Sequence, residues 1–401
     1  MPPTRSALWT SSSDPLADRR ARFVLPRAPG GGDAAYLAGN SLGALPRAVV
    51  AAVQSAVADQ WGAAGVAGWD EHAWWSAPDR VGARLGRLVG AAPGCTVAGD
   101  STSVQLFGAL VAAARLHGGD SRRRVLLADA HGFPTDRYLA GSAARVGGLE
   151  LRTGPPAELD PGPDTAVVTV SAVDFRTGER LDLAPVVERA HAAGAVVVLD
   201  LSHATGVLPV DLTALDVDLA VGCSYKYLNG GPGAPAFAAV APRHVDVLDP
   251  VLTGWSGHAR PFAMEDDWVP AGGAGRLRVG TPPMLSLLAL EAALAEFDGV
   301  ATEDLWARAL ALGDVFLDEL DRRAPGVEVV TPREHARRGG HLAVRVDDAD
   351  ARCAALAREG VVVDARPPDL LRFGFSPLYV SPDDAVRAAD ALARLLAGAR
   401  A

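Results

Sequence analysis

The sequence predicts an α/β fold, in which a mainly parallel sheet lies between helices in a large domain and a smaller α+β domain follows. Short apolar runs of strand length occur at 125–128, 166–170, 195–199 and 219–222. Helical patterns separate them, and strands that alternate with helices form parallel βαβ units under helical cover. The expected helices of this part are 46–61, 81–89, 102–116 and 185–193, and a further strand is expected at 235–240.

The pattern changes after Pro282 and Pro283, where two long helical patterns precede shorter strands and helices. The expected elements are helices at 284–297, 303–323, 349–358 and 383–396, and strands at 327–330, 341–346, 361–365 and 370–375. We therefore predict three parts. Residues 1–45 form an N-terminal segment that packs with the small domain, residues 46–282 form the large domain, and residues 283–401 form the small domain.

Composition excludes several classes of protein. The chain has 401 residues, a net charge of −10 and no run of basic residues, which argues against nucleic acid as a partner. No apolar stretch approaches the ~18 residues of a membrane span, so we expect no membrane contact. The cysteines Cys95, Cys223 and Cys353 have no metal-ligand spacing, and we expect no metal site. Their sparse, odd number is typical of a reducing compartment, so we expect a cytoplasmic protein.

Lys226 is the single lysine of the chain, although lysine and arginine together number 38. A guanidinium stays protonated and cannot condense with an aldehyde, whereas a desolvated lysine amine can form a Schiff base. We therefore predict that Lys226 binds pyridoxal 5′-phosphate (PLP) covalently. The alternative is a surface lysine left by chance.

Asp200 and His203 follow the apolar run 195–199. The carboxyl ends of parallel strands face the ligand crevice of an α/β sheet. A carboxylate there can pair with a pyridinium nitrogen and keep it protonated, and the imidazole of His203 can bond the O3′ of the ring. Lys226 follows the next expected strand, so the two groups would approach one ring from two sides. Alternatively, Asp200 is an ordinary helix N-cap.

Thr102 and Ser103 open an expected helix, directly after Asp100 and Ser101. The free N–H groups and the positive dipole end of a helix bind phosphate, and hydroxyl groups add donors. N-capping by Asp100 or Ser101 accounts for the same residues and can coexist with phosphate binding.

Phe133 and Arg372 are two further candidates. Phe133 comes shortly after the expected strand 125–128, where its ring can stack on a cofactor or pack in the core. Arg372 lies in the apolar run 370–375, where an unpaired guanidinium would be expensive to bury. A bidentate clamp on an amino-acid carboxylate would account for it. Alternatively, its side chain points outward.

Seven motifs, in their order and spacing, resemble those of the kynureninase family. They are residues 36–43, 100–107, 133–136, 200–203, 224–229, 254–258 and 371–379. The resemblance implies a PLP-dependent transferase fold of type I and a homodimer with shared active sites. It also implies an amino-acid substrate, L-kynurenine, which is hydrolysed to anthranilate and L-alanine by cleavage of the Cβ–Cγ bond.

The resemblance assigns roles residue by residue. The implied catalytic residues are Lys226, Tyr225 and Asp200, with Tyr225 as the candidate for proton delivery. The implied cofactor contacts are Thr102, Ser103, Phe133, Asp136, Ser171, Asp200, His203, Tyr225 and Lys226, with Trp255 and Thr281 reaching across the dimer interface. The implied substrate contacts are Arg372, which binds the α-carboxylate, and Asn40, Trp69, His72 and Ser256.

Two positions depart from the family pattern. An aromatic residue commonly follows the tryptophan of the 254–258 motif, and Ser256 stands there instead. The smaller side chain indicates a pocket for a ring-substituted kynurenine, such as 3-hydroxykynurenine. Thr281 stands where animal-type members tend to have Asn. Together with an early aromatic contact from Trp69 or His72, it resembles bacterial members that prefer kynurenine, so the two departures point in different directions.

Other functions share this scaffold. A class V aminotransferase, an epimerase and a cysteine desulfurase or selenocysteine lyase use the same pairing of Asp and Lys. A desulfurase usually needs a mobile reactive cysteine, and none of the three cysteines lies in a segment that suits this role. A non-catalytic PLP-binding protein is an alternative of another class, which the joint presence of Lys226, Asp200 and Arg372 disfavours.

Overall fold

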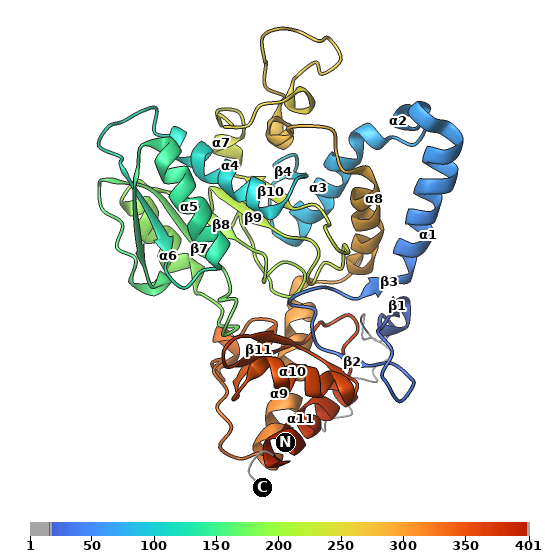
Figure 1. The fold of residues 1–401 in the computed structure, drawn as a ribbon. Helices are drawn as coiled ribbons and strands as arrows, with labels where there is room; N and C mark the ends of the chain where they lie inside the picture. The colour runs from blue at the N-terminus through green and yellow to red at the C-terminus, as the bar shows by residue number, and fades with distance from the viewer. Residues whose placement is uncertain (1–15, 17, 399–401) are drawn as a thin grey trace.

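A seven-stranded sheet forms the centre of the computed structural model, which describes residue 16 and residues 18–398 (Figure 1). The strand order is β4-β10-β9-β8-β7-β5-β6. The strands are β4 (Thr96–Ala98), β5 (Val125–Asp129), β6 (Glu150–Gly154), β7 (Thr165–Ser171), β8 (Val196–Asp200), β9 (Leu219–Gly222) and β10 (Phe237–Val240). Strands β6, β5, β7, β8 and β9 run parallel, and β10 is antiparallel to both of its neighbours. The expected mainly parallel sheet is confirmed.

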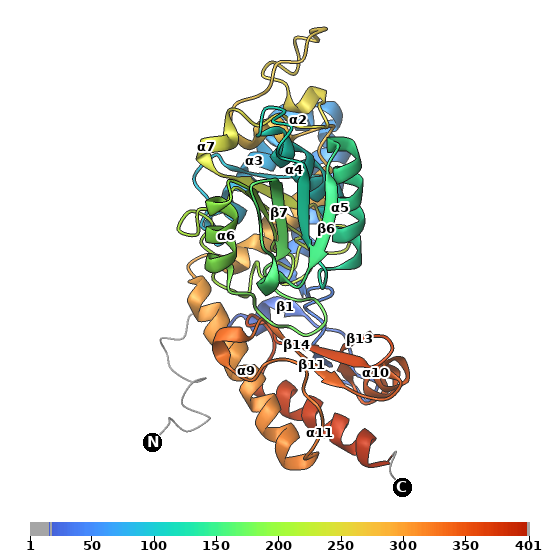
Figure 2. The ribbon, with the colours of Figure 1, turned by 90° about the vertical axis from the view of Figure 1, so that its left-hand side faces the viewer.

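Helices cover both faces of this sheet (Figure 2). The helices of this part of the chain are α1 (Arg47–Ser55), α2 (Gly68–Glu71), α3 (Ala77–Leu88), α4 (Thr102–Arg115), α5 (Pro134–Gly147), α6 (Leu183–Ala192), α7 (Pro242–Val245) and α8 (Met284–Ala293). Val196 and Val198 of β8 pack in one buried cluster with α4 and α5. Val197 and Leu199 pack in another cluster with α3 and α6. Successive side chains of a strand point to opposite faces, so the apolar run of β8 is buried on both sides.

A smaller antiparallel sheet, in the order β11-β14-β13, lies below the large sheet in Figure 1. The elements of this part are α9 (Thr302–Arg323), β11 (His341–Arg345), α10 (Ala349–Arg358), β12 (Val361–Val362), β13 (Asp364–Arg366), β14 (Leu370–Gly374) and α11 (Pro382–Gly398). Helices α9 and α11 pack against each other.

Two strand expectations in this part were wrong in detail. Residues 327–330 form no strand, because Val329 makes only an isolated bridge, to Val344. The expected strand 361–365 is divided into β12 and β13, because the two halves pair with different partners. β12 pairs with β2 (Ala35–Tyr36), and β13 pairs with β14.

The segment before α1 is tied to the smaller part through the parallel pair of β2 and β12. β1 (Phe23–Val24) pairs with β3 (Leu45–Pro46), which leads into α1. A π-helix (Ala56–Ala63) continues α1. Helix α8 follows the expected domain boundary and packs against α1 and α3. The division into 1–45, 46–282 and 283–401 stays a prediction.

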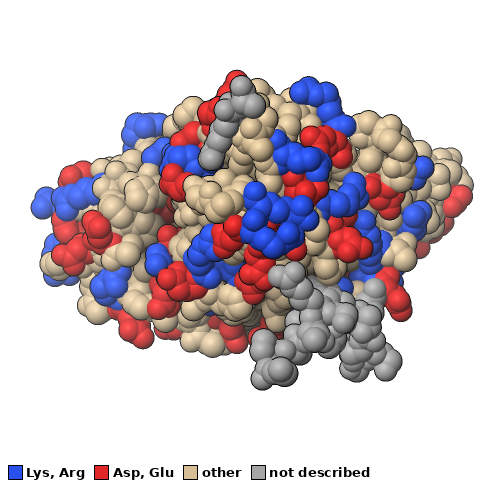
Figure 3. All heavy atoms as spheres, turned by 90° about the horizontal axis from the view of Figure 1, so that it is seen from below, with Lys and Arg blue, Asp and Glu red and all other residues tan. Residues whose placement is uncertain are grey.

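Acidic and basic side chains are interspersed over the face of the molecule seen in Figure 3. Binding to a phosphate backbone needs an extended basic surface, which this face does not offer. Within the described part of the chain, no helix is long and apolar enough to cross a membrane.

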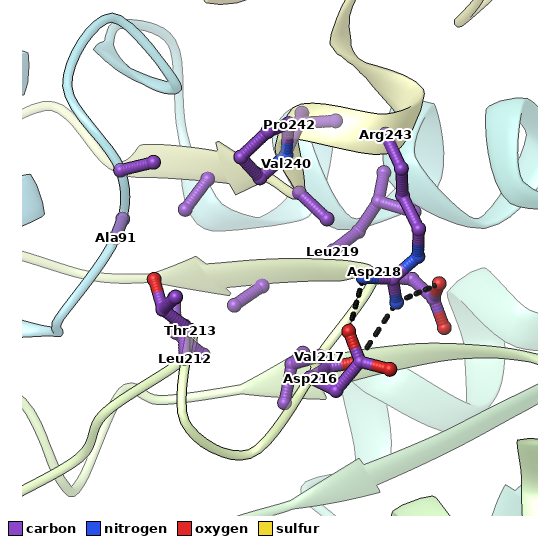
Figure 4. Close-up of a pocket in the computed structure, with 14 residues that line it drawn as sticks. Ala91, Leu212, Thr213, Asp216, Val217, Asp218, Leu219, Val240, Pro242 and Arg243 are labelled. Atoms are coloured by element: carbon purple, nitrogen blue, oxygen red, sulfur yellow. Dashed lines mark hydrogen bonds and ion pairs between the residues drawn. The ribbon is translucent and has the colours of Figure 1, made fainter.

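A cavity of about 250 Å³ lies at the end of β9 and β10 that is remote from Lys226 (Figure 4). Arg243 bridges the carboxylates of Asp216 and Asp218 at its rim. Asp218 also accepts hydrogen bonds from the backbone N–H of Val197, at 2.7 Å, and from two histidines. The cavity opens at the amino ends of the parallel strands, whereas ligands of α/β sheets bind at the carboxyl ends. Its polar rim therefore serves to join the sheet to α7.

Candidate active site

The carboxyl ends of β7, β8 and β9 meet at one edge of the large sheet. Ser171, the last residue of β7, lies beside Asp200, the last residue of β8. β9 ends at Gly222, and Lys226 lies in the loop that follows. Polar residues predicted from separate motifs are thus close in space, as expected for adjacent parallel strands.

Lys226 lies next to His203. The Nζ of Lys226 is 3.3 Å from both Nδ1 and Nε2 of His203. Burial, followed by the positive charge of Lys226, holds the pKa of His203 well below its usual range. The imidazole is therefore neutral, with one donor and one acceptor nitrogen available to Lys226 or to a cofactor oxygen.

The backbone of the lysine loop is held by the N-terminal segment. The N–H of Gly43 donates a hydrogen bond to the Tyr225 carbonyl oxygen at 2.8 Å. A Cβ atom at Gly43 would overlap the carbonyl oxygen of Lys226 and the side chain of Asn229. Only glycine can approach the loop this closely.

The carboxyl groups of Asp200, which is buried, and Asp136, which is half-buried, form a pair. Oδ1 of Asp200 accepts hydrogen bonds from the N–H and the hydroxyl of Ser202, at 2.9 and 2.6 Å. Asp136 lies in the first turn of α5, and within the described chain its Oδ2 is buried without a hydrogen-bond partner. Burial, and then the charge of Asp200, raise the pKa of Asp136 to about 8. Such a pair needs a neighbouring cation or a shared proton. The protonated ring nitrogen of PLP fits that requirement.

Helix α4 presents its amino end at the same edge of the sheet. Ser101 is the N-cap, and its side chain accepts a long hydrogen bond, 3.4 Å, from the N–H of Val104. The first N–H groups of a helix have no intrahelical acceptor. With the hydroxyls of Thr102 and Ser103, they form a set of donors that suits a phosphate group.

Phe133 immediately precedes α5, and its side chain is 42% exposed. Its ring and the ring of Phe175 are perpendicular, with centroids 5.2 Å apart and planes at 89°. An exposed aromatic ring that is supported by a neighbouring ring can stack on a planar ligand.

Tyr225 carries a hydroxyl that stays protonated. Burial, and then the neighbouring Cys223, raise the pKa of Tyr225 far above its usual range. The Nζ of Lys226 lies 5.9 Å from the centroid of the tyrosine ring. The tyrosine thus keeps a hydroxyl proton that it can donate.

Arg372 is fully buried in β14, so the outward orientation is excluded. Its Nε donates to Oδ1 of Asp364 at 2.7 Å, Nη2 donates to Oδ2, and Nη1 donates to the carbonyl oxygen of Phe175. Burial alone would raise the pKa of Asp364, but the hydrogen bond from Arg372 lowers it below its usual value. A guanidinium has five N–H groups, so two remain for a substrate carboxylate.

A family model described as the kynureninase C-terminal domain matches residues 305–392. A curated kynureninase of Deinococcus radiodurans is 47% identical over 394 residues, which cover 96% of this chain and 94% of the relative. The chain belongs to the kynureninase family. A kynureninase of Pseudomonas fluorescens is 40% identical over 382 residues, with 93% of this chain and 91% of the relative covered.

Solved structures confirm the fold outside the kynureninase family. A mutant of C-DES with glycine covalently linked to its PLP cofactor has a TM-score of 0.78 at 18% identity, covering 93% of this chain and 98% of the other. The cysteine desulfurase CsdA of Escherichia coli has a TM-score of 0.77 at 20% identity, covering 95% and 98%. These similarities establish the type I fold and, at such identities, nothing further.

Three residues assigned by resemblance to kynureninases lie in an aromatic cluster. Trp69 contacts Trp74 and Trp75 edge-on, and the ring of His72 is 6.4 Å from that of Trp74. Trp75 in turn contacts Trp255 at 5.1 Å. Within one chain, the rings of Trp69, His72 and Trp255 therefore contact other members of this aromatic cluster.

Three further residues that the resemblance assigns lie outside the aromatic cluster: Ser256 and Thr281 lie together, and Asn40 lies elsewhere. Ser256 and Thr281 border a small cavity together with Asp100 and Gln105, near the amino end of α4. Ser256 is buried, and its hydroxyl has no hydrogen-bond partner in the described chain. Asn40 is fully buried with an unpartnered side-chain amide, against Gly374.

Sequence reasoning missed three residues that the fold brings into the site. Phe175 supports both Phe133 and Arg372, and Asp364 pairs with Arg372. His341 lies with its ring centroid 5.6 Å from that of His203. The signal for Asp364 was a charged residue in an otherwise apolar stretch. His341 lay in an expected strand, and Phe175 in an expected loop, so neither stood out.

Proposed function

We propose that this chain hydrolyses L-kynurenine to anthranilate and L-alanine, with PLP attached to Lys226. The observation that carries the proposal is the meeting of Lys226, Asp200 and His203 at one sheet edge, in a chain 47% identical to a named kynureninase. A reactive amine and a carboxylate for the ring nitrogen are the groups that PLP chemistry on an amino acid requires.

Lys226 and the side chains around it each have a separate role in the proposed reaction. When bound, PLP supplies an electron sink for the negative charge that develops on the substrate Cα. The Nζ of Lys226 holds the cofactor and, once released from it, takes the Cα proton. Asp200 keeps the proton on the ring nitrogen. Arg372 orients the α-carboxylate through its two remaining N–H groups.

One water molecule balances the reaction. It adds to the γ-carbonyl carbon of the substrate, which leaves as the carboxylate carbon of anthranilate when the Cβ–Cγ bond breaks. Cβ takes up a proton and becomes the methyl group of alanine. Tyr225 is the candidate proton donor for this step, because its hydroxyl stays protonated.

Four residues bear on which kynurenine is preferred. The unpartnered hydroxyl of Ser256 borders a small cavity and can bond an added polar group, such as a ring hydroxyl. This favours a ring-substituted substrate. Thr281 and the aromatic residues Trp69 and His72 favour unsubstituted kynurenine. We propose unsubstituted kynurenine as the reference substrate and 3-hydroxykynurenine as its main competitor.

A homodimer with shared sites is also part of the proposal. The loop between α7 and α8 projects from the body of the molecule and carries Phe262, 67% exposed, and Met264, 74% exposed (Figures 1 and 2). Trp255 of the same loop is half-exposed. Exposed apolar side chains on one projecting loop are typical of a protein interface.

The cysteines favour this function over that of a desulfurase. Cys95 and Cys223 are buried, and Cys353 donates to the carbonyl oxygen of Val363. Burial raises the pKa of all three thiols, which disfavours the reactive thiolate. Free thiols suit a reducing compartment, and we propose a cytoplasmic location.

A competition assay tests the substrate. The PLP-loaded protein receives equimolar L-kynurenine, 3-hydroxy-L-kynurenine and a ring-methylated analogue, and alanine and each arylamine are quantified over time. We expect anthranilate to form fastest. If a substituted arylamine forms fastest, the result would indicate that Ser256 enlarges the substrate pocket. No alanine from any substrate would rule out the proposed reaction.

Replacement of the lysine tests the chemistry. Lys226→Arg keeps the charge but cannot form a Schiff base, so we expect loss of the covalent cofactor's absorption and a fall in activity of at least about a thousandfold. Arg122→Lys, the reverse exchange at an exposed position, is the matched control and should leave both unchanged.

A further inference from the structure

His341, the first residue of β11, is buried at the edge of the active site. Both of its ring nitrogens are buried without a hydrogen-bond partner in the described part of the chain. A buried polar group without a partner is costly and calls for an explanation. The proposed reaction assigns no step to this imidazole.

Two neighbours define the position of the ring. Its centroid is 5.6 Å from that of His203, with the planes at 50°, and His203 is the imidazole beside Lys226. On the smaller sheet, Ala343 of β11 lies opposite Arg372 of β14. His341 precedes Ala343 by two residues and so points to the same face of the sheet as Arg372. His341 thus links the carboxylate-binding face to the imidazole next to the lysine.

The backbone around His341 is fixed by close contacts. A Cβ atom at Gly340 would lie 2.7 Å from Cγ2 of Val207 and 2.9 Å from the hydroxyl oxygen of Tyr227. A Cβ atom at Gly178 would overlap the carbonyl oxygen of His341. The start of β11 is therefore in close contact with Val207, Tyr227 and Gly178. The ring of His341 cannot turn out to solvent unless this strand moves.

The charge state of the ring follows from its surroundings. Burial, and then the positive charge of Arg372, hold the pKa of His341 well below its usual range. The other charged groups that act on it are Asp364, Lys226 and Arg366. His341 and His203 are both neutral, and each offers one N–H donor and one acceptor nitrogen. Two such rings can share one hydrogen bond or one bridging water.

We propose that His341 is a positioning residue that fixes the tautomer of His203, through a hydrogen bond or one bridging water. The tautomer determines which nitrogen of His203 carries the proton, and therefore which nitrogen donates and which accepts toward Lys226 and the cofactor it carries. Partners that act through another residue in this way orient it and tune its basicity. The inference rests on the proposed attachment of PLP to Lys226, and it is independent of which kynurenine is preferred.

Two substitutions separate hydrogen bonding from packing. His341→Phe keeps a planar ring and removes both nitrogens, whereas His341→Gln keeps one donor and one acceptor in a side chain of similar length. In His341→Phe we expect a shifted pH midpoint for the absorption of the bound cofactor. We also expect kcat to fall about tenfold, the effect of losing one hydrogen bond, with KM within about twofold. In His341→Gln, the pH midpoint and kcat should both be close to their wild-type values.

A second readout does not depend on activity. The chain has nine histidines. In protein labelled with ¹⁵N-histidine, the ring of His203, identified by its loss in His203→Asn, should show one tautomer in the wild type. It should show a mixture of two tautomers in His341→Phe.

His117→Phe is the matched control, because His117 is a half-buried histidine whose Nε2 bonds to the carbonyl oxygen of Ala166 on the large sheet. It should move neither the cofactor midpoint nor the His203 signals. If His341→Phe fails to fold, His341→Leu takes its place.

Four outcomes would overturn the inference. They are an unmoved midpoint in a folded His341→Phe protein, equal impairment of the Phe and Gln variants, a rise in KM alone, and a single His203 tautomer in every variant. A wild-type protein without any cofactor absorption would instead contradict the proposed function, and with it this inference.

Discussion

Asp136 is a side chain whose charge state should depend on whether PLP is bound. Its Oδ2 is buried without a partner, and burial together with the charge of Asp200 raises its pKa to about 8. Asp364, which is also half-buried, has the opposite shift because Arg372 donates to it. Asp364 has a guanidinium as its partner, whereas Asp136 faces the carboxylate of Asp200 and is stabilised only by the charge of Lys226. We propose that the ring nitrogen of PLP, when bound, supplies a further positive charge beside Asp136.

The raised pKa of Asp136 predicts a pH dependence of stability. A carboxyl group with a raised pKa in the folded state contributes its full stability below the unfolded pKa of about 3.9, and this is lost as the pH rises through about 8. We expect the Tm of the cofactor-free protein to fall over this window more steeply in the wild type than in Asp136→Asn. Bound PLP should reduce the fall in the wild type. Thermal unfolding at a series of pH values measures this, and equal slopes for the two proteins would contradict it.

At the scale of elements, the site depends on how tightly neighbouring segments approach one another. Gly43 of the N-terminal segment bonds to the backbone of Tyr225 and leaves no room for a side chain against Lys226. At the other end of the parallel strands, Asp218 joins β8 to α6 and α7 through its hydrogen bonds to Val197, His191 and His244. The contact of Gly43 fixes the backbone of the loop that carries Lys226. The hydrogen bonds of Asp218 stabilise the sheet from which this loop extends.

We predict that Gly43→Ala displaces the lysine loop. Its Cβ would overlap the Lys226 carbonyl oxygen, so we expect kcat/KM to fall by about 100-fold, the cost of a misplaced reactive group. Gly108→Ala is the matched control. Gly108 lies in α4 with open space around its Cβ position, and alanine there should raise stability by up to about 1 kcal/mol. Steady-state kinetics and denaturant unfolding of both variants test this, and equal kinetics would refute it.

We predict that Asp218→Asn lowers the free energy of unfolding by about 3 kcal/mol at neutral pH, because it removes a buried charge from its partners. Burial alone would raise the pKa of Asp218, but hydrogen bonds from His244, Val197 and His191 lower it well below its usual range. The stability gained from a lowered pKa is present above the ordinary value of about 3.9 and is lost as the pH falls below it. The free energies of unfolding of the wild type and Asp218→Asn should therefore converge at acidic pH.

Asp216 provides the control for that measurement. It also pairs with Arg243, but its side chain is 67% exposed, against 4% for Asp218. Exposed ion pairs contribute at most about 1 kcal/mol, so Asp216→Asn should have a small effect in urea unfolding. A larger loss from Asp216→Asn than from Asp218→Asn would contradict the assignment.

At the scale of the whole molecule, one chain brings together several residues that are predicted to bind the cofactor. Lys226, Asp200 and Asp136 lie close to one another at the sheet edge, whereas the ring of Trp255 contacts that of Trp75, with centroids 5.1 Å apart. A second copy of the chain would bring its projecting loop to the site of its partner. The proposed homodimer would thus complete the site.

We predict that Phe262→Glu combined with Met264→Glu separates the dimer into monomers. Two charges would be placed in an apolar contact, and activity should fall with dimer content. Val146→Glu, at a position 57% exposed on α5 and outside the projecting loop, should remain dimeric and active. Sedimentation velocity and activity are measured at matched concentrations. A wild-type monomer with full activity would contradict the proposal.

Sequence patterns predicted the elements whose signal is local. The apolar runs of β7, β8 and β9 are buried on both faces of a parallel sheet, and one polar residue, Thr169 of β7, lies within them. The elements that were missed lack such a signal. β6 is an edge strand with exposed polar residues, β4 has three residues, and α5 begins within a motif that was interpreted as a loop.

The sequence by itself determined the alternation of strands and helices, the single lysine, and the polar residues at the ends of β7, β8 and β9, because each depends on neighbours in the chain. Only the tertiary structure decided that Arg372 pairs with Asp364, that Asp136 faces Asp200, and that His341 lies against His203. These contacts join segments far apart in sequence. Burial sets their charge states, and burial is a property of the folded chain.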